Sequence, residues 1–496
     1  MNSPFHVLDS HGKRIALCEP WPVQVCRVCA ALLANGVSTG DRVLAWLPRG
    51  WEEAALCQAT AALGAVWVSV PRRSSPGQIS ALVEDAEPAI AICGKGETSR
   101  LGPGPWLEWS DLLSAGESAP ECCPCKPLST GLAALCYTSG STGQPKGVMV
   151  THENLEGAHE RIEAYLQHTP HDRLLSLMPL SSPWGLLQWR MARRVGAAIV
   201  LPPAVAMASE LVRTIRAAGV TGLAALPPTW IALVDYLDSR HETLPDLRYV
   251  TTSGGALPRR ILDRFPAVFP RTEIWMTYGL TEAFRTTVLP AREFATRKGS
   301  LGRPCPGVRI EIIRPDGTAA APGETGELVH LGRCVTLGYW RQPELTRHTF
   351  SVRPGHEAVL GNGPVHYSGD RVRRDHDGYL WFEGRDDELI KTGGHRVSAT
   401  LIEEALSAIP GVTHAVVGGV PDEALGQRIV AAIELSADSP NAVAGVRTTL
   451  RHTLSSHQQP SELHLWPGTM PLNANGKLNR PEILAWLLAS VAAKNA

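Results

Sequence analysis

Short apolar strands alternate with helices through the first half of the chain, and this alternation constrains the possible folds more than any other feature. Apolar periodicity predicts a helix that ends near Gly36, and Asp41–Pro48 is a short apolar strand. A helix over residues 51–65 precedes the strand Val66–Val70, and Ser75-Pro76 begins another helix because proline suits a first helical turn. Strands that alternate with helices form parallel sheets covered on both faces, so the sequence predicts an α/β fold.

Two changes of pattern follow farther along the chain. The α/β rhythm returns at the apolar strands 197–203 and 221–228, which a helix separates. From about residue 300 the segments alternate apolar and polar residues, and the segment 307–317 ends in Asp-Gly, a hairpin signal. This pattern predicts an antiparallel β unit. After Arg385, a helix–strand–helix pattern predicts a small α+β domain.

Composition excludes several classes of protein. The chain has 496 residues and a formal charge of −1, so it has no overall basic field that attracts nucleic acid. No apolar run reaches the roughly 18 residues of a membrane span. The N-terminus lacks the basic start and apolar centre of a signal peptide. We therefore expect a cytoplasmic protein with no nucleic-acid partner and no membrane span.

Five of the cysteines are closely spaced. Cys26 and Cys29 lie in an amphipathic segment, where a thiol packs as a small apolar group, and no second pair at zinc-binding spacing follows. We expect no metal site there. Cys122, Cys123 and Cys125 lie in a proline-rich segment, and the sequence assigns them no role.

The most specific local signal is a loop of glycines and hydroxyl residues after an apolar strand. Its residues are Thr138, Ser139, Gly140, Ser141, Thr142, Gly143, Pro145, Lys146 and Gly147. Hydroxyls and exposed amides suit polyphosphate oxygens, and a lysine can place its charge on the β- and γ-phosphates. The spacing differs from that of the P-loop, in which Ser or Thr follows the lysine. We expect the loop at a strand–helix junction, with Thr151 as the N-cap of the helix.

This loop resembles the signature of the adenylate-forming superfamily, which contains AMP-forming acyl-CoA synthetases, the adenylation domains of nonribosomal peptide synthetases, and luciferases. Further motifs of that family follow in order over nearly the whole chain. The resemblance implies a large N-terminal domain over residues 1–384, made of parallel sheets flanked by helices plus a β-barrel-like unit. It also implies a hinge over residues 385–388 and a small, mobile α+β domain over residues 389–496.

Two segments resemble the parts of the family that bind adenine and phosphate. The first consists of Tyr278, Gly279, Leu280, Thr281 and Glu282. By this resemblance Thr281 binds the α-phosphate, Glu282 supports Mg²⁺ and Tyr278 lies beside the adenine; a carboxylate suits this hard cation. The second segment follows a strand, resembles the family's adenine-contacting strand end, and contains Gly254, Gly255 and Ala256.

Two further segments resemble the ribose site and the hinge. Tyr367–Asp370 resembles a motif whose aspartate accepts hydrogen bonds from both ribose hydroxyls, and a carboxylate is a natural partner for a vicinal diol. In Gly384–Lys391 the resemblance implies that Arg385 also contacts the ribose and that Asp387 is the pivot of the small domain. Lys391 then faces the active site only after the domain has rotated.

The last motif, Pro471–Arg480, resembles the family's C-terminal segment, whose lysine bridges the substrate carboxylate and the α-phosphate. A cation there stabilises the charge that develops when the carboxylate attacks phosphorus. The chain has only eight lysines, and Lys146, Lys391 and Lys477 all fall in these motifs. The resemblance implies four catalytic residues: Lys477, Thr281, Glu282 and Lys391.

The sequence does not identify the acid. Ser182 stands where acyl-CoA synthetases often have histidine, and Pro183 where amino-acid-activating domains have aspartate. An unpaired buried ammonium is costly, so a standard α-amino acid is disfavoured. Arg285 is expected to be a solvated surface residue, and contact with a polar substrate tail is the alternative. The candidates for a pocket wall, each of which could instead be core, are Ser182, Trp184, Trp189, Trp230 and Phe284.

The expected reaction uses ATP and Mg²⁺ to convert a small carboxylic acid into an acyl-AMP and then transfers the acyl group to a thiol. No carrier domain follows Lys477, so the acceptor is expected to be CoA or the phosphopantetheine of a separate acyl or peptidyl carrier protein. We expect a monomer or a homodimer. One alternative is a stand-alone amino-acid adenylation enzyme that loads a carrier protein. Alternatives from other classes are a luciferase-like oxygenase and an inactive nucleotide-binding protein.

Overall fold

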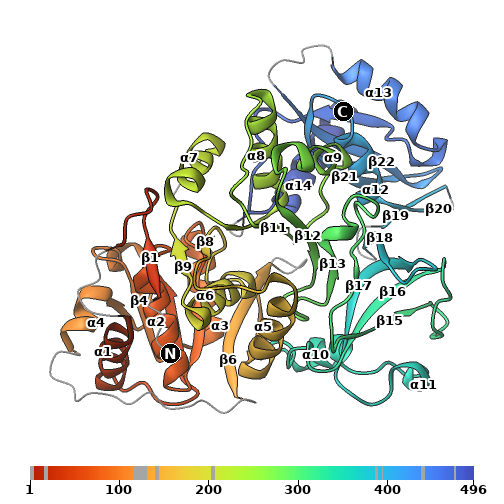
Figure 1. The fold of residues 1–496 in the computed structure, drawn as a ribbon. Coiled ribbons are helices and arrows are strands. Elements are labelled where there is room, and N and C mark those ends of the chain that lie inside the picture. Colours follow the sequence, from red (N-terminus) through yellow and green to blue (C-terminus); the bar gives the residue numbers. More distant parts are fainter. Residues whose placement is uncertain are drawn as a thin grey trace.

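The computed structural model describes residues 5–15, 21–115, 131–139, 145–202, 207–385, 389–393, 395–436, 442–473 and 476–495. The N-terminal part is a six-stranded sheet with the order β5-β4-β2-β3-β6-β7, parallel except for the pair β6–β7. Its strands are β2 (Arg42–Trp46), β3 (Val66–Ser69), β4 (Ile90–Cys93), β5 (Trp106–Glu108), β6 (Leu132–Ser139) and β7 (Pro145–Thr151). Its helices are α1 (Trp21–Ala34), α2 (Trp51–Ala62), α3 (Pro76–Ala86), α4 (Trp109–Ala115) and the 3-10 turn η1 (Thr98–Arg100). The predicted alternation of strands and helices is confirmed (Figure 1).

The second sheet has eight strands in the order β1-β9-β8-β10-β11-β12-β13-β14, and it is parallel from β1 to β12. The strands are β1 (His6–Leu8), β8 (Arg173–Leu175), β9 (Ala198–Val200), β10 (Gly222–Ala225), β11 (Tyr249–Thr252), β12 (Glu273–Tyr278), β13 (Thr287–Leu289) and β14 (Arg303–Pro304). The accompanying helices are α5 (His152–Leu166), α6 (Pro183–Val195), α7 (Ala208–Ala218), α8 (Pro227–Ser239), α9 (Arg259–Val268) and the 3-10 turn η2 (Ala291–Glu293).

Each face of the eight-stranded sheet has its own apolar core. Tyr249 and Trp275 belong to the core that contains residues of α5 and α6, whereas Val250 and Ile274 belong to the core under α8 and α9. Successive side chains of a strand point to opposite faces, so Thr251 and Thr277 lie on the same face as Tyr249 and Trp275. This alternation decides which side chains at the strand ends can meet.

The antiparallel unit predicted after residue 300 is a four-stranded sheet with the order β15-β16-β17-β18. Its strands are β15 (Arg309–Ile313), β16 (Thr325–Leu331), β17 (Val365–Arg374) and β18 (Leu380–Arg385), with the helices α10 (Pro343–Phe350) and α11 (Glu357–Leu360). The predicted Asp-Gly turn follows β15, where Thr318 accepts a hydrogen bond from the amide of Arg314 at 2.9 Å. The unit expected to be barrel-like is thus an antiparallel sheet.

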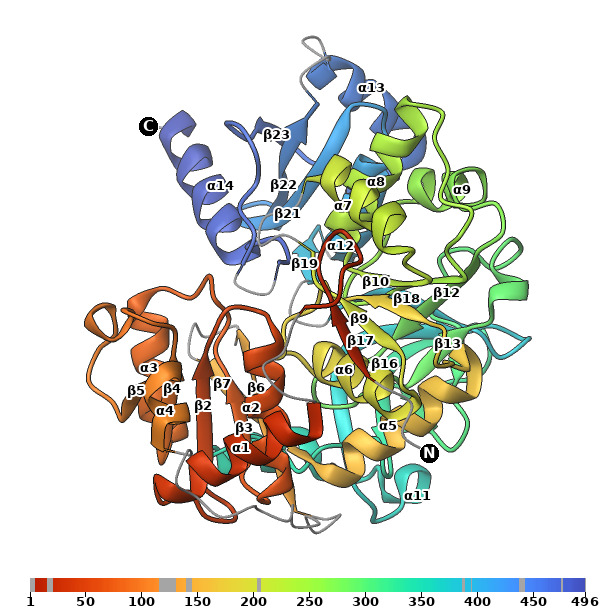
Figure 2. The same cartoon turned by 60° about the vertical axis from the view of Figure 1, so that its left-hand side comes forward.

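The C-terminal part has its own sheet, with the order β20-β19-β22-β21 and β23 beside β22. Its elements are β19 (Leu389–Thr392), β20 (His395–Ser398), α12 (Ala399–Ser407), β21 (Val412–Asp422), β22 (Gly426–Leu435), α13 (Ala442–Thr453), η4 (Ser456–Gln458), β23 (Glu462–Leu465) and α14 (Arg480–Asn495). Both ribbon views place it against α8 and α9 of the larger part (Figures 1 and 2). Arg260 of α9 donates to the carbonyls of Ser407 at 2.8 Å and Val412 at 3.2 Å, so this contact uses backbone acceptors.

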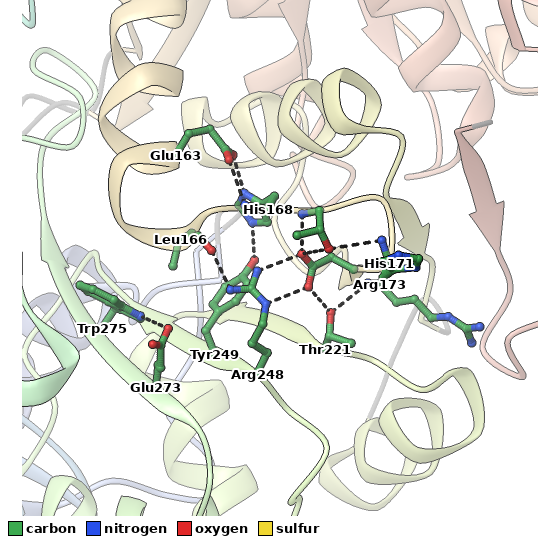
Figure 3. A network of polar contacts seen from close by, with 12 residues as sticks. Glu163, Leu166, His168, His171, Arg173, Thr221, Arg248, Tyr249, Glu273 and Trp275 are labelled. Carbon is green, nitrogen blue, oxygen red and sulfur yellow. Dashed lines mark hydrogen bonds and ion pairs between the residues drawn. The ribbon is translucent and has the colours of Figure 1, made fainter. Parts of the chain in front are cut away.

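A polar network holds the amino ends of the parallel strands together (Figure 3). Asp172, just before β8, accepts from Arg248 at 2.9 and 3.0 Å and from Thr221 at 2.8 Å. His168 pairs with Glu163 at 2.5 Å through Nδ1 and meets the hydroxyl of Tyr249 at 2.9 Å through Nε2. Each ionised group of the network has a partner of opposite charge or a hydrogen-bond partner from the chain itself.

In the described part of the chain, no helix is long and apolar enough to cross a membrane.

Candidate functional site

The carboxyl ends of β11 and β12 carry two of the predicted motifs. The exposed residues Gly254, Gly255 and Ala256 follow β11, and Tyr278 ends β12. Gly254 has a φ of +78°, in the left-handed region that favours glycine. Parallel α/β sheets bind ligands beyond the carboxyl ends of their strands. Both motifs therefore lie where such a fold places its site.

The turn after Tyr278 is compact because it contains Gly279. A Cβ on this residue would lie 2.5 Å from the backbone nitrogen of Arg285, a distance that no side chain tolerates. Leu280 and Ala283 exchange backbone hydrogen bonds of 2.9 and 3.3 Å across the turn. This turn fixes the half-buried Thr281 and Glu282 beside the strand end.

Tyr278 connects β12 to the predicted ribose motif on β17. Its hydroxyl donates to the carboxylate of Asp370, which also pairs with Nε of Arg385 at 3.4 Å. Burial and the neighbouring Asp370 charge raise the pKa of Tyr278 well above its usual value, so the phenol remains a donor. Three residues from separate predicted motifs thus meet at one point.

Two buried histidines form a stack with the ring of Tyr278. His330 stacks on Tyr278 with ring centroids 6.0 Å apart, and His366 stacks on His330 at 6.1 Å. Burial lowers the pKa of each to about 3, so both rings are neutral near pH 7. Neither histidine was predicted, because each alternates with apolar residues in a strand and resembles ordinary core.

Tyr339 joins the predicted magnesium residue to the predicted phosphate residue. Its hydroxyl donates to Oε1 of Glu282 at 3.0 Å, and Nζ of Lys146 lies 5.7 Å from the centre of its ring. Tyr339 was not predicted, because it belongs to none of the recognised motifs.

Glu282 fits a magnesium ion held jointly with a nucleotide. Its Oε2 has no hydrogen-bond partner within the described part of the chain. Mg²⁺ usually takes one or two carboxylates and completes its octahedron with substrate phosphates and water. The residues with described positions include no group of three or more His, Cys, Asp or Glu that could hold a metal by itself. Cys29 is buried and Cys26 is half-buried.

The C-terminal domain brings Lys477 to the end of β11. A Cβ on Gly254 would lie 3.3 Å from Cε of Lys477 and 3.4 Å from its Nζ, so the lysine side chain lies beside this glycine. Burial, and then the charge of Arg385, lower the pKa of Lys477, while Glu282 and Asp370 act in the opposite direction. The ammonium thus shares one electrostatic environment with these three residues, although it keeps access to solvent.

The glycine-rich loop joins two paired strands. Thr138 and Ser139 end β6, and Lys146 lies opposite Thr138 in β7. Gly140, Ser141, Thr142 and Gly143 lie outside the described residues, as does the cluster at Cys122, Cys123 and Cys125. The expected strand–helix junction is wrong, because the apolar residues after Lys146 pair with β6 as a strand before α5 begins. The predicted cap is confirmed: Thr151 accepts from the amide of Asn154 at 3.0 Å.

The predicted hinge is described only at its edges. Arg385 ends β18, and Asp387 lies outside the described residues. Lys391 has an exposed side chain in β19, and its amide donates to Gln427 at 2.8 Å. Among the described contacts none joins the Lys391 side chain to the nucleotide motifs, so of the two predicted catalytic lysines Lys477 is the one at the site in this structure.

Most of the predicted pocket residues are parts of the core. Trp230 is fully buried against Phe265 and Phe269, and Phe284 and Trp189 are also buried. Ser182 is the N-cap of α6: it accepts from the amide of Gly185 at 3.2 Å and donates to the carbonyl of Pro179 at 3.0 Å. Trp230 and Phe284 thus pack in the apolar cores, which is the alternative that the sequence left open for each candidate. Trp184 and Ser182 are half-buried.

Arg285 is buried, which contradicts the expectation of a solvated surface residue. It is 8% exposed, and its guanidinium lies 4.6 Å from the centre of the Trp184 ring. Its φ of +47° is uncommon for a residue other than glycine and turns the side chain back toward β12. There it donates to the hydroxyl of Thr277 at 2.5 Å. This reversal depends on the turn at Gly279 and could not be read from local sequence.

Comparisons with known proteins agree with this geometry. Residues 23–340 match the family described as AMP-binding enzyme, and residues 401–477 match the AMP-binding enzyme C-terminal domain. A sulfoacetate–CoA ligase of Cupriavidus necator is 32% identical over 470 residues, covering 91% of this chain and 88% of that protein. The mitochondrial malonate–CoA ligase of Mus musculus is 28% identical over 475 residues, covering 86% and 78%.

Solved structures show the same fold. The o-succinylbenzoate CoA synthetase of Bacillus subtilis, in complex with its acyl-adenylate intermediate, has a TM-score of 0.83 at 23% identity, over 96% of this chain and 94% of that chain. An anthranilate CoA ligase in complex with anthranoyl-AMP has a TM-score of 0.85 at 22% identity, over 98% and 95%. With the family matches over both parts of the molecule, these likenesses show that the chain belongs to the family of AMP-binding, adenylate-forming enzymes.

Proposed function

We propose that this chain uses ATP to convert a carboxylic acid into an acyl-AMP and then transfers the acyl group to a thiol. The observation that carries this proposal is the position of Lys477. This residue of the C-terminal domain lies beside Gly254 at the end of β11, within the electrostatic reach of Glu282, Asp370 and Arg385. A cation placed there by a separate domain suits a reaction in which negative charge develops between two substrates.

The first half-reaction needs no general base. A carboxylic acid is already ionised near pH 7, so its oxygen attacks the α-phosphorus of ATP directly. The bond from that phosphorus to the bridging oxygen breaks, and pyrophosphate leaves. Lys477 and Thr281 stabilise the charge that develops on the α-phosphoryl oxygens.

The remaining residues bind the nucleotide. Asp370 and Arg385 bind the ribose, while Tyr278 and the segment Gly254–Ala256 flank the adenine. The loop Thr138–Gly143 and Lys146 hold the β- and γ-phosphates. Glu282 holds Mg²⁺, which supplies positive charge to the leaving pyrophosphate when it is bound.

The second half-reaction uses a different placement of the small domain. We assign residues 1–384 to the adenylating domain and residues 389–496 to the mobile domain, with the hinge at 385–388 and its pivot at Asp387. Rotation removes Lys477 from the strand end and brings Lys391 toward it. The thiol then attacks the carbonyl carbon of the mixed anhydride, and AMP leaves.

CoA is the acceptor that we propose. Relatives that match most of this chain are named CoA ligases, such as the sulfoacetate and malonate enzymes. A nonribosomal peptide synthetase of Salinispora arenicola also matches, although the chain spans only 5% of it, and a carrier protein is the second candidate. We further propose a cytoplasmic monomer or homodimer, which light scattering of the purified protein and cell fractionation would test.

Pyrophosphate exchange tests the proposal directly. Purified protein with MgATP and labelled pyrophosphate should form labelled ATP only when an accepted acid is present. The panel should hold aliphatic, aromatic and amino acids, together with malonate and sulfoacetate, which the names of two relatives contain. Exchange with no acid at all would refute acyl-AMP formation. Light emission or oxygen uptake would instead indicate an oxygenase, and the thioester product with CoA or with a loaded carrier would identify the acceptor.

A further inference from the structure

Arg285 is a buried cation without a carboxylate partner among the described residues. It is 8% exposed, and its side-chain contacts are the hydroxyl of Thr277 and the ring of Trp184. The titratable groups that face it are Tyr165, Tyr249 and Cys305, and all three are neutral near pH 7 because burial raises their pKa values. Burial also lowers the pKa of Arg285 itself.

Two less deeply buried arginines have the carboxylate partner that Arg285 lacks. Arg248 pairs with Asp172 at 2.9 Å, and Arg480 pairs with Glu403 at 2.8 Å, although both arginine side chains are about a quarter to a third exposed. Removing a guanidinium from water costs several kcal/mol unless an anion compensates it. Arg285 is more deeply buried than either, so an anion supplied from outside the chain would compensate its charge.

Two buried hydroxyls, on segments that neighbour the contacts of Arg285, have no hydrogen-bond partner in the described structure. Thr251 is 4% exposed, and its side chain lies on the same sheet face as Thr277, one strand away. Ser181 is 8% exposed and precedes α6, the helix that carries Trp184. An unsatisfied buried hydroxyl costs free energy, and a bound anion accepts hydrogen bonds from such donors.

This group of residues lies close to the proposed reaction centre. The hydroxyl of Thr277 donates to the carbonyl of Thr252 at 3.0 Å, and Gly254, which lies beside Lys477, is two residues farther on. Two residues of extended chain span about 7 Å. A short acid is therefore long enough to reach from Lys477 toward Arg285.

We propose that Arg285 binds a second anionic group, a carboxylate or a sulfonate, at the far end of a short acid. The first carboxylate lies at Lys477 and reacts with ATP, while the second receives the guanidinium of Arg285 and the hydroxyl of Thr251. This inference rests on the proposed function and specifies the class of acid.

Matched pairs of acids test the inference. Malonate and succinate are compared with their half-amides, and sulfoacetate with methylsulfonylacetate, so that each pair differs in the charge of the far group. In acid-dependent pyrophosphate exchange, the anionic member should have a kcat/KM at least about 100-fold higher, since a site built for a polar group rejects an analogue that cannot complete it. Equal use of both members, or a preference for propionate, hexanoate or benzoate, would overturn the inference but leave the proposed function intact. Failure with every acid would refute the proposed function itself.

Variants show which residue makes the distinction. Arg285→Gln should bring the ratio of anionic to neutral acids close to one, mainly through KM for the acid, with KM for ATP unchanged. Arg285→Lys should restore part of the preference. If Arg285→Gln slowed both members of each pair equally, the residue would be structural. Thr251→Val keeps the shape of the side chain and should weaken the preference by a smaller factor of about 3–10.

The matched control is Arg248→Gln, which removes a partly buried arginine at the opposite edge of the same sheet (Figure 3). It should lower the melting temperature without changing the ratio between anionic and neutral acids. Loss of the preference in this variant would mean that the ratio reports general damage to the fold, and the assignment to Arg285 would fail.

Discussion

The two edges of the eight-stranded sheet treat charged side chains in opposite ways. At the amino edge, Asp172 receives two hydrogen bonds from Arg248, and His168 joins Glu163 to Tyr249 (Figure 3). At the carboxyl edge, Arg285 and Lys477 lie without a carboxylate at ion-pairing distance in the described structure. The same strands connect both edges, so this difference is not a property of the sheet.

The difference separates charge used for folding from charge kept for substrates. When the chain itself pairs a buried charge, breaking the pair destabilises the fold, and the paired charge is not available to bind a substrate. A charge left incomplete lowers stability until a ligand completes it, and such positions mark functional sites. The amino edge should therefore affect unfolding, and the carboxyl edge should affect turnover.

The largest expected effect comes from Lys477→Ala. It should lower acyl-AMP formation by roughly 10²–10³-fold, as for the loss of one preorganised charge contact in the transition state. Transfer of the acyl group from supplied acyl-AMP to CoA should be spared, which rapid-quench measurement of each half-reaction would show. Equal loss in both half-reactions would contradict the two placements of the small domain.

At the amino edge, Asp172→Ala should lower the free energy of unfolding by about 2–3 kcal/mol. This is less than the 3–5 kcal/mol of a fully buried pair, because Arg248 is 34% exposed. Denaturant titration measures the loss. Pyrophosphate exchange per folded molecule should stay unchanged, and a selective loss of catalysis would remove the distinction between the two edges.

The same pair gives a smaller effect that depends on pH. Burial alone would raise the pKa of Asp172, but the hydrogen bonds from Arg248, Thr169 and Thr221 outweigh it, and the net pKa is lowered. A folded pKa below the unfolded one contributes stability above the unfolded value, and this stability is lost as the pH falls toward the folded value. The free energy of unfolding should therefore fall below about pH 4, and Asp172→Asn should fall less steeply.

Ser182→Ala should have the smallest effect. Loss of this N-cap should cost about 1 kcal/mol in thermal or denaturant unfolding. Its hydroxyl is already used by Gly185 and Pro179, so acid-dependent exchange should change less than about twofold. A large rise in KM for the acid would show that Ser182 contacts the substrate after all.

Local signals predicted the elements well. Ser75-Pro76 and Thr151 mark helix starts because a capping side chain and its amide partner are three residues apart. The strand β7 was missed, since a strand that continues from a phosphate loop has no boundary signal of its own. Apart from the glycine-rich phosphate loop, the roles of the nucleotide motifs were predicted through resemblance, and the contact of Tyr278 with Asp370 joins residues 92 positions apart in the chain.

Residues that act through tertiary packing could not be predicted. His330, His366 and Tyr339 have the sequence pattern of core residues, and only their stacking and hydrogen bonds connect them to the site. Arg285 was expected in water because arginine usually is exposed. Its burial follows from a left-handed backbone that a tight turn imposes on it.

The place where Lys477 rests on the large domain is defined by the lack of a side chain. Gly254 has no side chain, so the Lys477 ammonium can approach the backbone at the end of the strand. Even a single methyl group at residue 254 would crowd the lysine and strain a backbone with φ of +78°. The absence of a side chain at residue 254 therefore sets how closely the C-terminal domain can approach the large domain.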